Sequence, residues 1–202
     1  FVGVGSTPSY GTSGQALLSG GSGAAPTWGG AGALVFISSQ TVSTAVASVD
    51  FTSGISSTYD DYIVYFSDVT PGTNTTAFYS RLYKSGAFVT SGYSQSLANL
   101  QGTPVYTAAN TATQINITSA TVSNTVSILN GSCTLFNMNS ALGNRATVIG
   151  QAFFNTASST AQIVTVFGGT QSTAAATTGF QFYFSSGNIA SGTFRLYGIA
   201  KS

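Results

Sequence analysis

Histidine and glutamate are absent from this 202-residue chain, which holds one Cys, five Lys or Arg, and four Asp. Without His, Ser-His-Asp and Cys-His catalytic groups cannot form. A single cysteine excludes an intrachain disulfide, and with no His beside it no zinc-ligand set exists. The sequence also lacks a GxxxxGK[ST] phosphate loop. We therefore expect a protein that is not an enzyme and that has no catalytic residues, no metal site and no cofactor.

Charge is also scarce, at 4% of residues against about 25% in average domains. Five cations cannot form the basic patch that nucleic-acid binding or a polybasic membrane anchor requires. No apolar run reaches the ~18 residues of a membrane-spanning helix, so we expect no membrane insertion. Ordinary disorder is excluded as well, because 43% hydrophobic and 12% aromatic residues supply a core.

A surface with so little charge favours assembly. Interface cores are depleted in Lys, Glu and Asp, and burying uncharged surface against another copy limits uncontrolled association. We therefore predict a protein that works in a fixed assembly. The alternative is a secreted or surface β-domain with an exterior rich in Ser and Thr.

Composition divides the chain into two parts. Residues 1–32 are rich in Gly and Ser, and their large apolar residues are few and spaced as if to pack on another surface. We predict an extended arm that docks on its own domain or on neighbouring subunits, whereas a flexible tether is the alternative. The residues expected to form the assembly contacts are Tyr10, Leu17, Leu18 and Trp28.

Residues 33–202 form the second part, which has the pattern of an antiparallel β-sandwich, jelly-roll-like. Short runs rich in Val, Ile, Thr, Tyr and Phe alternate with turns rich in Gly, Asn and Ser. The segment 95–101 (QSLANLQ) is a candidate for one helical turn. Strands are predicted at 33–40, 45–51, 62–69, 77–84, 92–98, 114–119, 126–138, 145–154, 161–168, 179–185 and 192–200.

The few polar groups with chemical potential have ordinary structural interpretations. Asp60 and Asp61 form the one acidic doublet, which suits either a calcium site or, as we favour, a turn in which one Asp accepts backbone N–H bonds. Cys133 lies among strand residues and is expected to be a small buried apolar residue.

Three arginines fall inside predicted strands. On a solvent-facing side they would protect sheet edges, and pairs such as Arg195 with Asp50 or Asp61 are conceivable. The other two are Arg81 and Arg145.

Aromatic residues near turns are candidates for exposure and for contact with a receptor. Aromatic faces suit the apolar faces of sugar rings, although packing in a core or interface is the commoner role. The candidates are Tyr59, Tyr62, Tyr93 and Tyr106.

Three segments carry a resemblance to a known family. SYGTSGQALLSGGSGAAPTWGG (9–30) resembles a module that recurs before β-rich domains in tail fibres and other appendage proteins of tailed bacteriophages. FQFYFSSGNIASGTFRLYGIAKS (180–202) looks like the carboxyl end of many phage virion proteins, and 33–71 looks like the first strands of that domain. The middle of the chain, 85–140, is least matched.

This resemblance implies an oligomeric structural protein of the virion, often a homotrimer, assembled in the bacterial host cytoplasm. Its partners would be copies of itself, other virion proteins of tail, baseplate or capsid, and a host surface glycan or outer-membrane receptor. A tail-fibre-type appendage is the first hypothesis, and a head fibre or capsid decoration protein is the alternative. A secreted carbohydrate-binding module is less favoured, and a depolymerase is disfavoured by the missing catalytic groups.

Overall fold

The computed structural model of the chain describes residues 10–12, 15–30, 32–101, 105–118, 122–126, 129–143, 145–156 and 161–200. Within these residues every regular element is a β-strand, so the expected all-β class is confirmed. The strands are β1 (Gln15–Leu18), β2 (Thr27–Gly30), β3 (Leu34–Val42), β4 (Ser48–Phe51), β5 (Tyr62–Pro71), β6 (Phe78–Lys84), β7 (Ala87–Phe88), β8 (Tyr93–Asn99), β9 (Val105–Ala112), β10 (Ile115–Asn116), β11 (Leu129–Phe136), β12 (Thr147–Asn155), β13 (Gln162–Gln171), β14 (Thr177–Phe184) and β15 (Ile189–Ile199).

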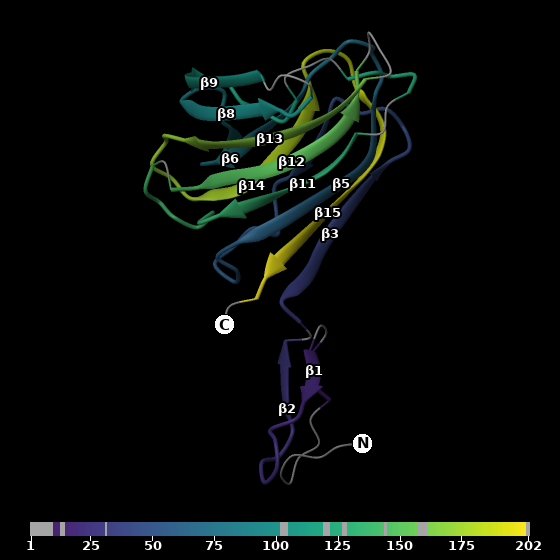
Figure 1. Cartoon of the computed structure of the whole chain (residues 1–202). Helices are drawn as coiled ribbons and strands as arrows, with labels where there is room; N and C mark the ends of the chain where they lie inside the picture. Colours follow the sequence, from purple (N-terminus) through teal and green to yellow (C-terminus); the bar gives the residue numbers. More distant parts are fainter. Residues whose placement is uncertain are drawn as a thin grey trace.

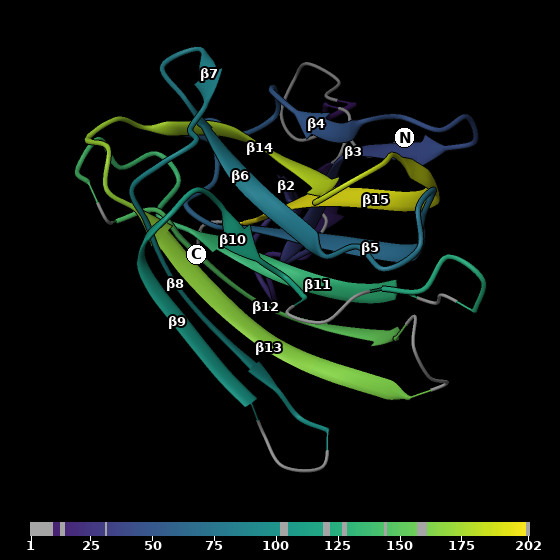
Figure 2. The same ribbon diagram turned by 90° about the horizontal axis from the view of Figure 1, so that it is seen from above.

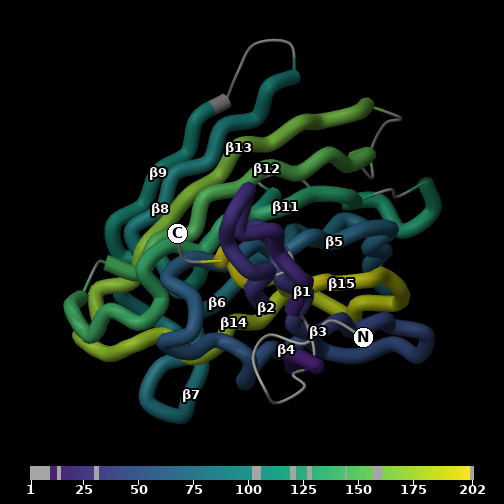
Figure 3. Tube along the Cα trace, turned by 90° about the horizontal axis from the view of Figure 1, so that it is seen from below, coloured from purple at the N-terminus to yellow at the C-terminus, as the bar shows by residue number. Residues whose placement is uncertain are grey.

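Two antiparallel sheets of unequal size form the sandwich. The large sheet has the order β3-β15-β5-β11-β12-β13-β8-β9, and Figure 3 shows these strands side by side. The small sheet has the order β10-β6-β14-β4, with β7 paired to β6. In Figure 2 the small sheet lies across the large one, which curves beyond it toward β8 and β9. The predicted antiparallel sandwich is therefore confirmed.

Alternating aromatic residues build the centre of the core. On β14, Phe180, Phe182 and Phe184 are buried, because alternate residues of a strand point to the same face. Phe182 reaches the large sheet, where its ring centroid lies 5.6 Å from that of Phe66 and 5.4 Å from that of Phe194. Such aromatic pairs contribute about 0.5–1.5 kcal/mol each beyond their buried area. Phenylalanine rings thus make direct contacts between the two sheets.

The N-terminal segment differs from the predicted extended arm. Strands β1 and β2 pair with each other as an antiparallel hairpin, which forms a sheet of its own. Figure 1 shows this hairpin beyond the start of β3, apart from the two sheets of the sandwich. The sandwich itself begins and ends at one place, since the backbone nitrogen of Ala200 donates to the carbonyl of Ala33 at 2.8 Å.

The candidate helical turn at 95–101 is wrong. Residues up to Asn99 belong to β8, which pairs with β13 on one side and β9 on the other. Tyr93 and Leu97 of β8 are buried, and Gln95 between them accepts a bond from the backbone nitrogen of Asn116 at 2.5 Å. A period of two therefore outweighs the weak helical propensity of the segment.

Other strand boundaries also shift. Arg145 precedes β12, which begins at Thr147, so only Arg81 and Arg195 lie inside strands as predicted. Strands β7 and β9 were not predicted. None of the described segments forms a helix that is long and apolar enough to cross a membrane.

Candidate functional site

The hairpin brings three of the four expected assembly residues together. Leu17 lies opposite Trp28 in the register, and Leu18 follows it opposite Thr27. At the open end of the hairpin, the side-chain oxygen of Gln15 accepts the backbone N–H of Thr12 at 2.8 Å. Gly11 has a φ of +69°, which favours glycine.

A close approach of backbone and side chain joins Gly11 to β2. The ring of Trp28 packs on Gly11, where an added Cβ would lie 2.8 Å from Trp28 Cδ2. Trp28 is therefore half-buried within its own hairpin, which explains how a segment so rich in glycine keeps a defined conformation.

The hairpin exposes apolar side chains. Leu17 is 38% exposed and Leu18 is 44% exposed, while Tyr10, just before Gly11, is 80% exposed. No charged residue occurs between Tyr10 and Gly30. In a two-stranded sheet each strand has an open edge with unpaired backbone groups. Such a hairpin alone is marginally stable in water. The hairpin is therefore a surface suited to contact with another protein.

Two of the four tyrosines proposed for receptor contact are buried, so the expectation of exposure was wrong for them. Tyr62 begins β5, and its hydroxyl donates to the carbonyl of Ser56 at 2.7 Å and accepts the backbone N–H of Ser56 at 2.8 Å. Tyr93 begins β8 and points between the sheets. Both residues follow turns, but each occupies a strand position whose side chain points toward the core.

The other two tyrosines differ from each other. Tyr59 is half-buried, with its ring over the backbone of Gly198 and its centroid 5.8 Å from that of Tyr62. Tyr106 on β9 is 74% exposed. Tyr106 is therefore the candidate that is best placed to contact a ligand.

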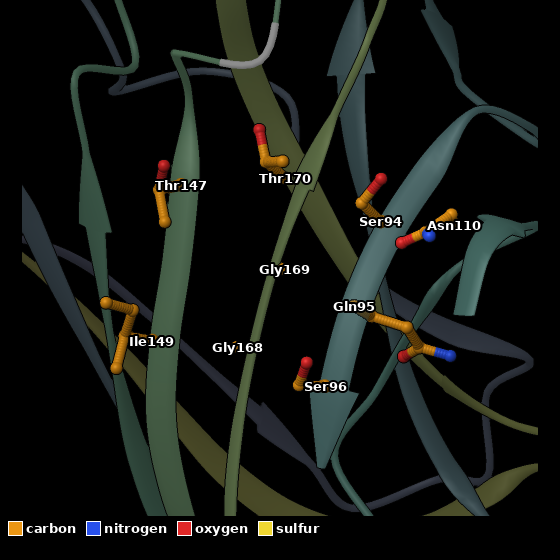
Figure 4. Close-up of a pocket in the computed structure, with 9 residues that line it drawn as sticks. All are labelled: Ser94, Gln95, Ser96, Asn110, Thr147, Ile149, Gly168, Gly169 and Thr170. Atoms are coloured by element: carbon orange, nitrogen blue, oxygen red, sulfur yellow. The ribbon is translucent and has the colours of Figure 1, made fainter. Parts of the chain in front are cut away.

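Tyr106 borders a hollow of about 510 Å³ on the outer face of the large sheet. A second hollow, of about 380 Å³, adjoins it and shares Ser96, Ile149 and Gly168 with it. We call these two hollows together the trough; it crosses β9, β8, β13 and β12. Figure 4 shows the second hollow with its lining side chains.

One end of the trough is polar and the other is apolar. At the polar end Ser94, Ser96 and Asn110 have side chains without a hydrogen-bond partner among the described residues. The hydroxyls of the other two polar residues already make hydrogen bonds. Thr147 donates to the carbonyl of Arg145, and Thr170 donates to the carbonyl of Ala146. The apolar end is formed by Ala98, Tyr106, Ala108, Ile149 and Val166.

The trough is electrically neutral. Strands β8, β9, β11, β12 and β13 contain no charged residue. The one arginine on the outer face of the large sheet among the described strands is Arg195 on β15, whose Nη1 lies 3.5 Å from Ser67 Oγ of β5. Its proposed pair with Asp50 is wrong, because Asp50 lies on β4 of the small sheet and accepts a bond from Gln181.

The acidic doublet has a structural role in the loops near β5. Asp61 Oδ1 accepts the backbone N–H of Asn137 at 3.1 Å, and the Asp61 carbonyl accepts that of Ile199 at 3.0 Å. The favoured interpretation, an aspartate side chain that accepts backbone N–H, is confirmed for Asp61, although its donor lies in the segment after β11 and not in the turn itself. The described residues contain no group of three His, Cys, Asp or Glu side chains that could hold a metal ion.

Two buried titratable groups remain. Cys133 is buried as predicted, and burial raises the pKa of its thiol to about 12, so it is a poor nucleophile near neutral pH. Lys84 is also buried, and its Nζ donates to the carbonyls of Thr173 at 2.9 Å and Gln171 at 3.4 Å. Burial lowers the pKa of Lys84. This lysine fastens the loop between β13 and β14 to β6.

No protein family, no curated protein and no solved structure matches this chain. The hairpin, the trough and the pattern of charge are therefore the features of the molecule that bear on its function.

Proposed function

We propose that the chain is a structural subunit of a virion appendage of a tailed bacteriophage, of the tail-fibre type. In this proposal it assembles as an oligomer, most simply a homotrimer, and its sandwich contacts the host surface. Its role is not enzymatic. It is assembled in the bacterial cytoplasm and functions on the particle.

The observation that carries the proposal is the hairpin. The segment that resembles the phage appendage module forms a separate two-stranded sheet with Leu17 and Leu18 exposed. A hairpin of this size gains stability by packing against other strands. Neighbouring copies or an adjoining virion protein would cover its leucines and pair with its open edges. The sandwich would then be held at the end where Ala33 and Ala200 meet.

The scarcity of charge supports the same proposal. An isolated soluble domain usually keeps its molecules apart by net charge, whereas this chain has a formal net charge of +1. Fixed assembly buries part of such a surface. Repeated copies would also add weak contacts with a receptor into a larger avidity.

The trough favours a second candidate, a secreted carbohydrate-binding module. Such a module would bind through the trough but would not need the exposed leucines of the hairpin. The two candidates therefore differ in whether the hairpin mediates assembly.

Localisation on intact particles tests the proposal. Cryo-electron microscopy or a labelled antibody should find the protein on the tail or its fibres. Density on the shell would instead assign it to a head fibre or capsid decoration protein. Absence from particles would overturn the virion proposal and leave the secreted module.

Hairpin variants test assembly separately. Leu17→Asn combined with Leu18→Asn should convert the oligomer to monomer in analytical ultracentrifugation, because both exposed leucines are lost from the contact. Leu142→Asn is the matched control, since Leu142 is an exposed leucine far from the hairpin in sequence, at 61% exposure. An unchanged oligomer in the double variant would contradict the assembly role.

A further inference from the structure

We propose that the trough across β9, β8, β13 and β12 binds a neutral oligosaccharide. The inference rests on the proposed function for the source of this ligand, which would be a glycan of the host surface. The proposal places the contact with the host surface on the outer face of the large sheet.

The shape of the trough suits a short chain of sugar units. Its larger hollow has a volume of about 510 Å³, within the ~300–1,000 Å³ usual for ligand sites. It is open and shallow, with Tyr106 at one side and Ile149 and Val166 at the other. The Tyr106 side chain is 74% exposed, so its ring is available to stack on a ligand.

The chemistry of the lining matches that of a sugar ring, which has apolar faces and a rim of hydroxyls. Tyr106 and Val166 provide apolar surface for a ring face. Beside them, Ser94, Ser96 and Asn110 offer two hydroxyls and one amide that have no partner among the described residues. Hydroxyls and amides both donate and accept, which is what hydroxyl groups of a neutral sugar require.

The absence of charge decides the class of glycan. At the apolar end beside Tyr106, a carboxylate or sulfate would lose part of its hydration without gaining a cation as partner, since Arg145 precedes β12 next to Thr147 of the polar end. None of β8, β9, β11, β12 and β13 carries a lysine or arginine. Neutral hexoses and N-acetylhexosamines avoid that cost.

A peptide strand fits this place less well. Peptides that add to sheets bind along an open edge. The floor of the trough is formed by β13 and β8, and each of them already pairs on both sides. Their backbone groups are therefore used within the sheet, and only side chains remain to make contacts.

The test measures binding of the full-length protein to glycan probes by biolayer interferometry. The neutral probes are maltohexaose, chitohexaose and mannohexaose, and the charged probes are polygalacturonate and colominic acid, all displayed as multivalent conjugates. We expect binding to a neutral probe that changes little with salt. Absence of binding to every neutral probe, or salt-sensitive binding to charged probes alone, would overturn the proposal.

Three variants test the location. Tyr106→Ala should weaken binding about tenfold or more, and Ser96→Phe should fill the trough and abolish binding. Tyr65→Ala is the matched control, because Tyr65 is a 40% exposed tyrosine on β5 of the same sheet, outside the trough. Equal binding by all variants would overturn the location.

Ultracentrifugation of the same variants identifies a competing occupant. Loss of the oligomer in Tyr106→Ala would show that a second copy covers the trough and would overturn glycan binding there. Trough-dependent binding by a protein absent from particles would uphold the site and defeat the proposed function. A protein that is present on particles but binds no neutral probe would uphold the proposed function and overturn the glycan site.

Discussion

The hydroxyl of Tyr93 on the large sheet accepts a hydrogen bond from the backbone nitrogen of Leu82 on the small sheet, at 2.8 Å. The same hydroxyl donates to the carbonyl of Val89 at 3.0 Å. One phenol thus joins the two sheets and the connection between β7 and β8, which contains Val89. It also explains why a tyrosine stands at a fully buried position.

Removal of this hydroxyl should destabilise the sandwich. Tyr93→Phe leaves the buried N–H of Leu82 and carbonyl of Val89 without their partner, which should cost about 1–3 kcal/mol. Urea unfolding followed by circular dichroism measures the change. Tyr106→Phe is the control and should have no effect, because the Tyr106 side chain is exposed. Equal stabilities for the two variants would show that the bond contributes nothing.

Cys133 should respond to alkaline pH in a defined way. Burial raises the pKa of its thiol from 9.0 to about 12, so the unfolded chain loses this proton first as pH rises. The free energy of unfolding is therefore unaffected by Cys133 below pH 9.0 and falls between pH 9.0 and about 12. Cys133→Ala should lack this component.

The measurement is the difference in unfolding free energy between wild type and Cys133→Ala over a pH series. Other titrating groups such as Tyr93 are present in both proteins, so their contributions cancel in the difference. A difference that stays constant from neutral pH to pH 11 would refute the prediction. A thiol reagent should likewise leave Cys133 unmodified in the folded protein at neutral pH.

Glycines on opposite faces of the large sheet should differ in their tolerance of a side chain. An added Cβ at Gly150 on β12 would meet the carbonyl of Ser132 and come within 2.6 Å of Phe167 Cζ. Gly150→Ala should therefore destabilise the fold by about 1–3 kcal/mol through overpacking. At Gly168 on β13 the nearest atom is the Val148 carbonyl oxygen at 3.3 Å, so Gly168→Ala should change stability far less. Thermal unfolding of both variants compares them directly.

The hairpin should be needed for assembly but not for folding of the sandwich. Removal of residues 1–32 should leave a folded sandwich with reduced assembly, because the core lies between the two sheets that begin with β3 and β4. Circular dichroism and ultracentrifugation report the two properties. Unfolding of the truncated chain would show that the hairpin belongs to the core.

Trp28 should affect assembly more than the sandwich. Trp28→Ala removes the ring that packs on Gly11 and orders the hairpin. We expect weaker assembly with an unchanged unfolding temperature of the sandwich. Equal losses in both would contradict that separation.

Alternation predicted most of the sandwich because buried and exposed faces differ strongly along its strands. In β14, Phe180, Phe182 and Phe184 all point into the core, as the sequence indicates. Strand β9 was missed because Tyr106, Ala108 and Ala109 give no apolar alternation; this strand forms the sheet edge by pairing with β8. Pairing, and not propensity, determines such a strand.

The candidate site was less accessible to prediction than the fold. Proximity to turns suggested exposure for Tyr62 and Tyr93, whereas each occupies an inward position of its strand. The trough combines side chains of four strands, and the order of those strands cannot be read from local pattern. Glycine content likewise concealed the hairpin, whose ring-on-backbone contact between Trp28 and Gly11 depends on tertiary structure.

The pairing of β3 with β15 has a mechanical consequence. A pull applied through the hairpin reaches the sandwich at the start of β3, beside the point where Ala200 bonds to Ala33. The tension then runs along β3, whose register with β15 extends from the pair Leu34 and Ile199 to the pair Val42 and Gly192. The hydrogen bonds of that ladder lie across the direction of pull and share the load, so they resist together and do not open one at a time. In the proposed appendage, a strand held in this way would bear the drag on a particle tethered to a moving cell.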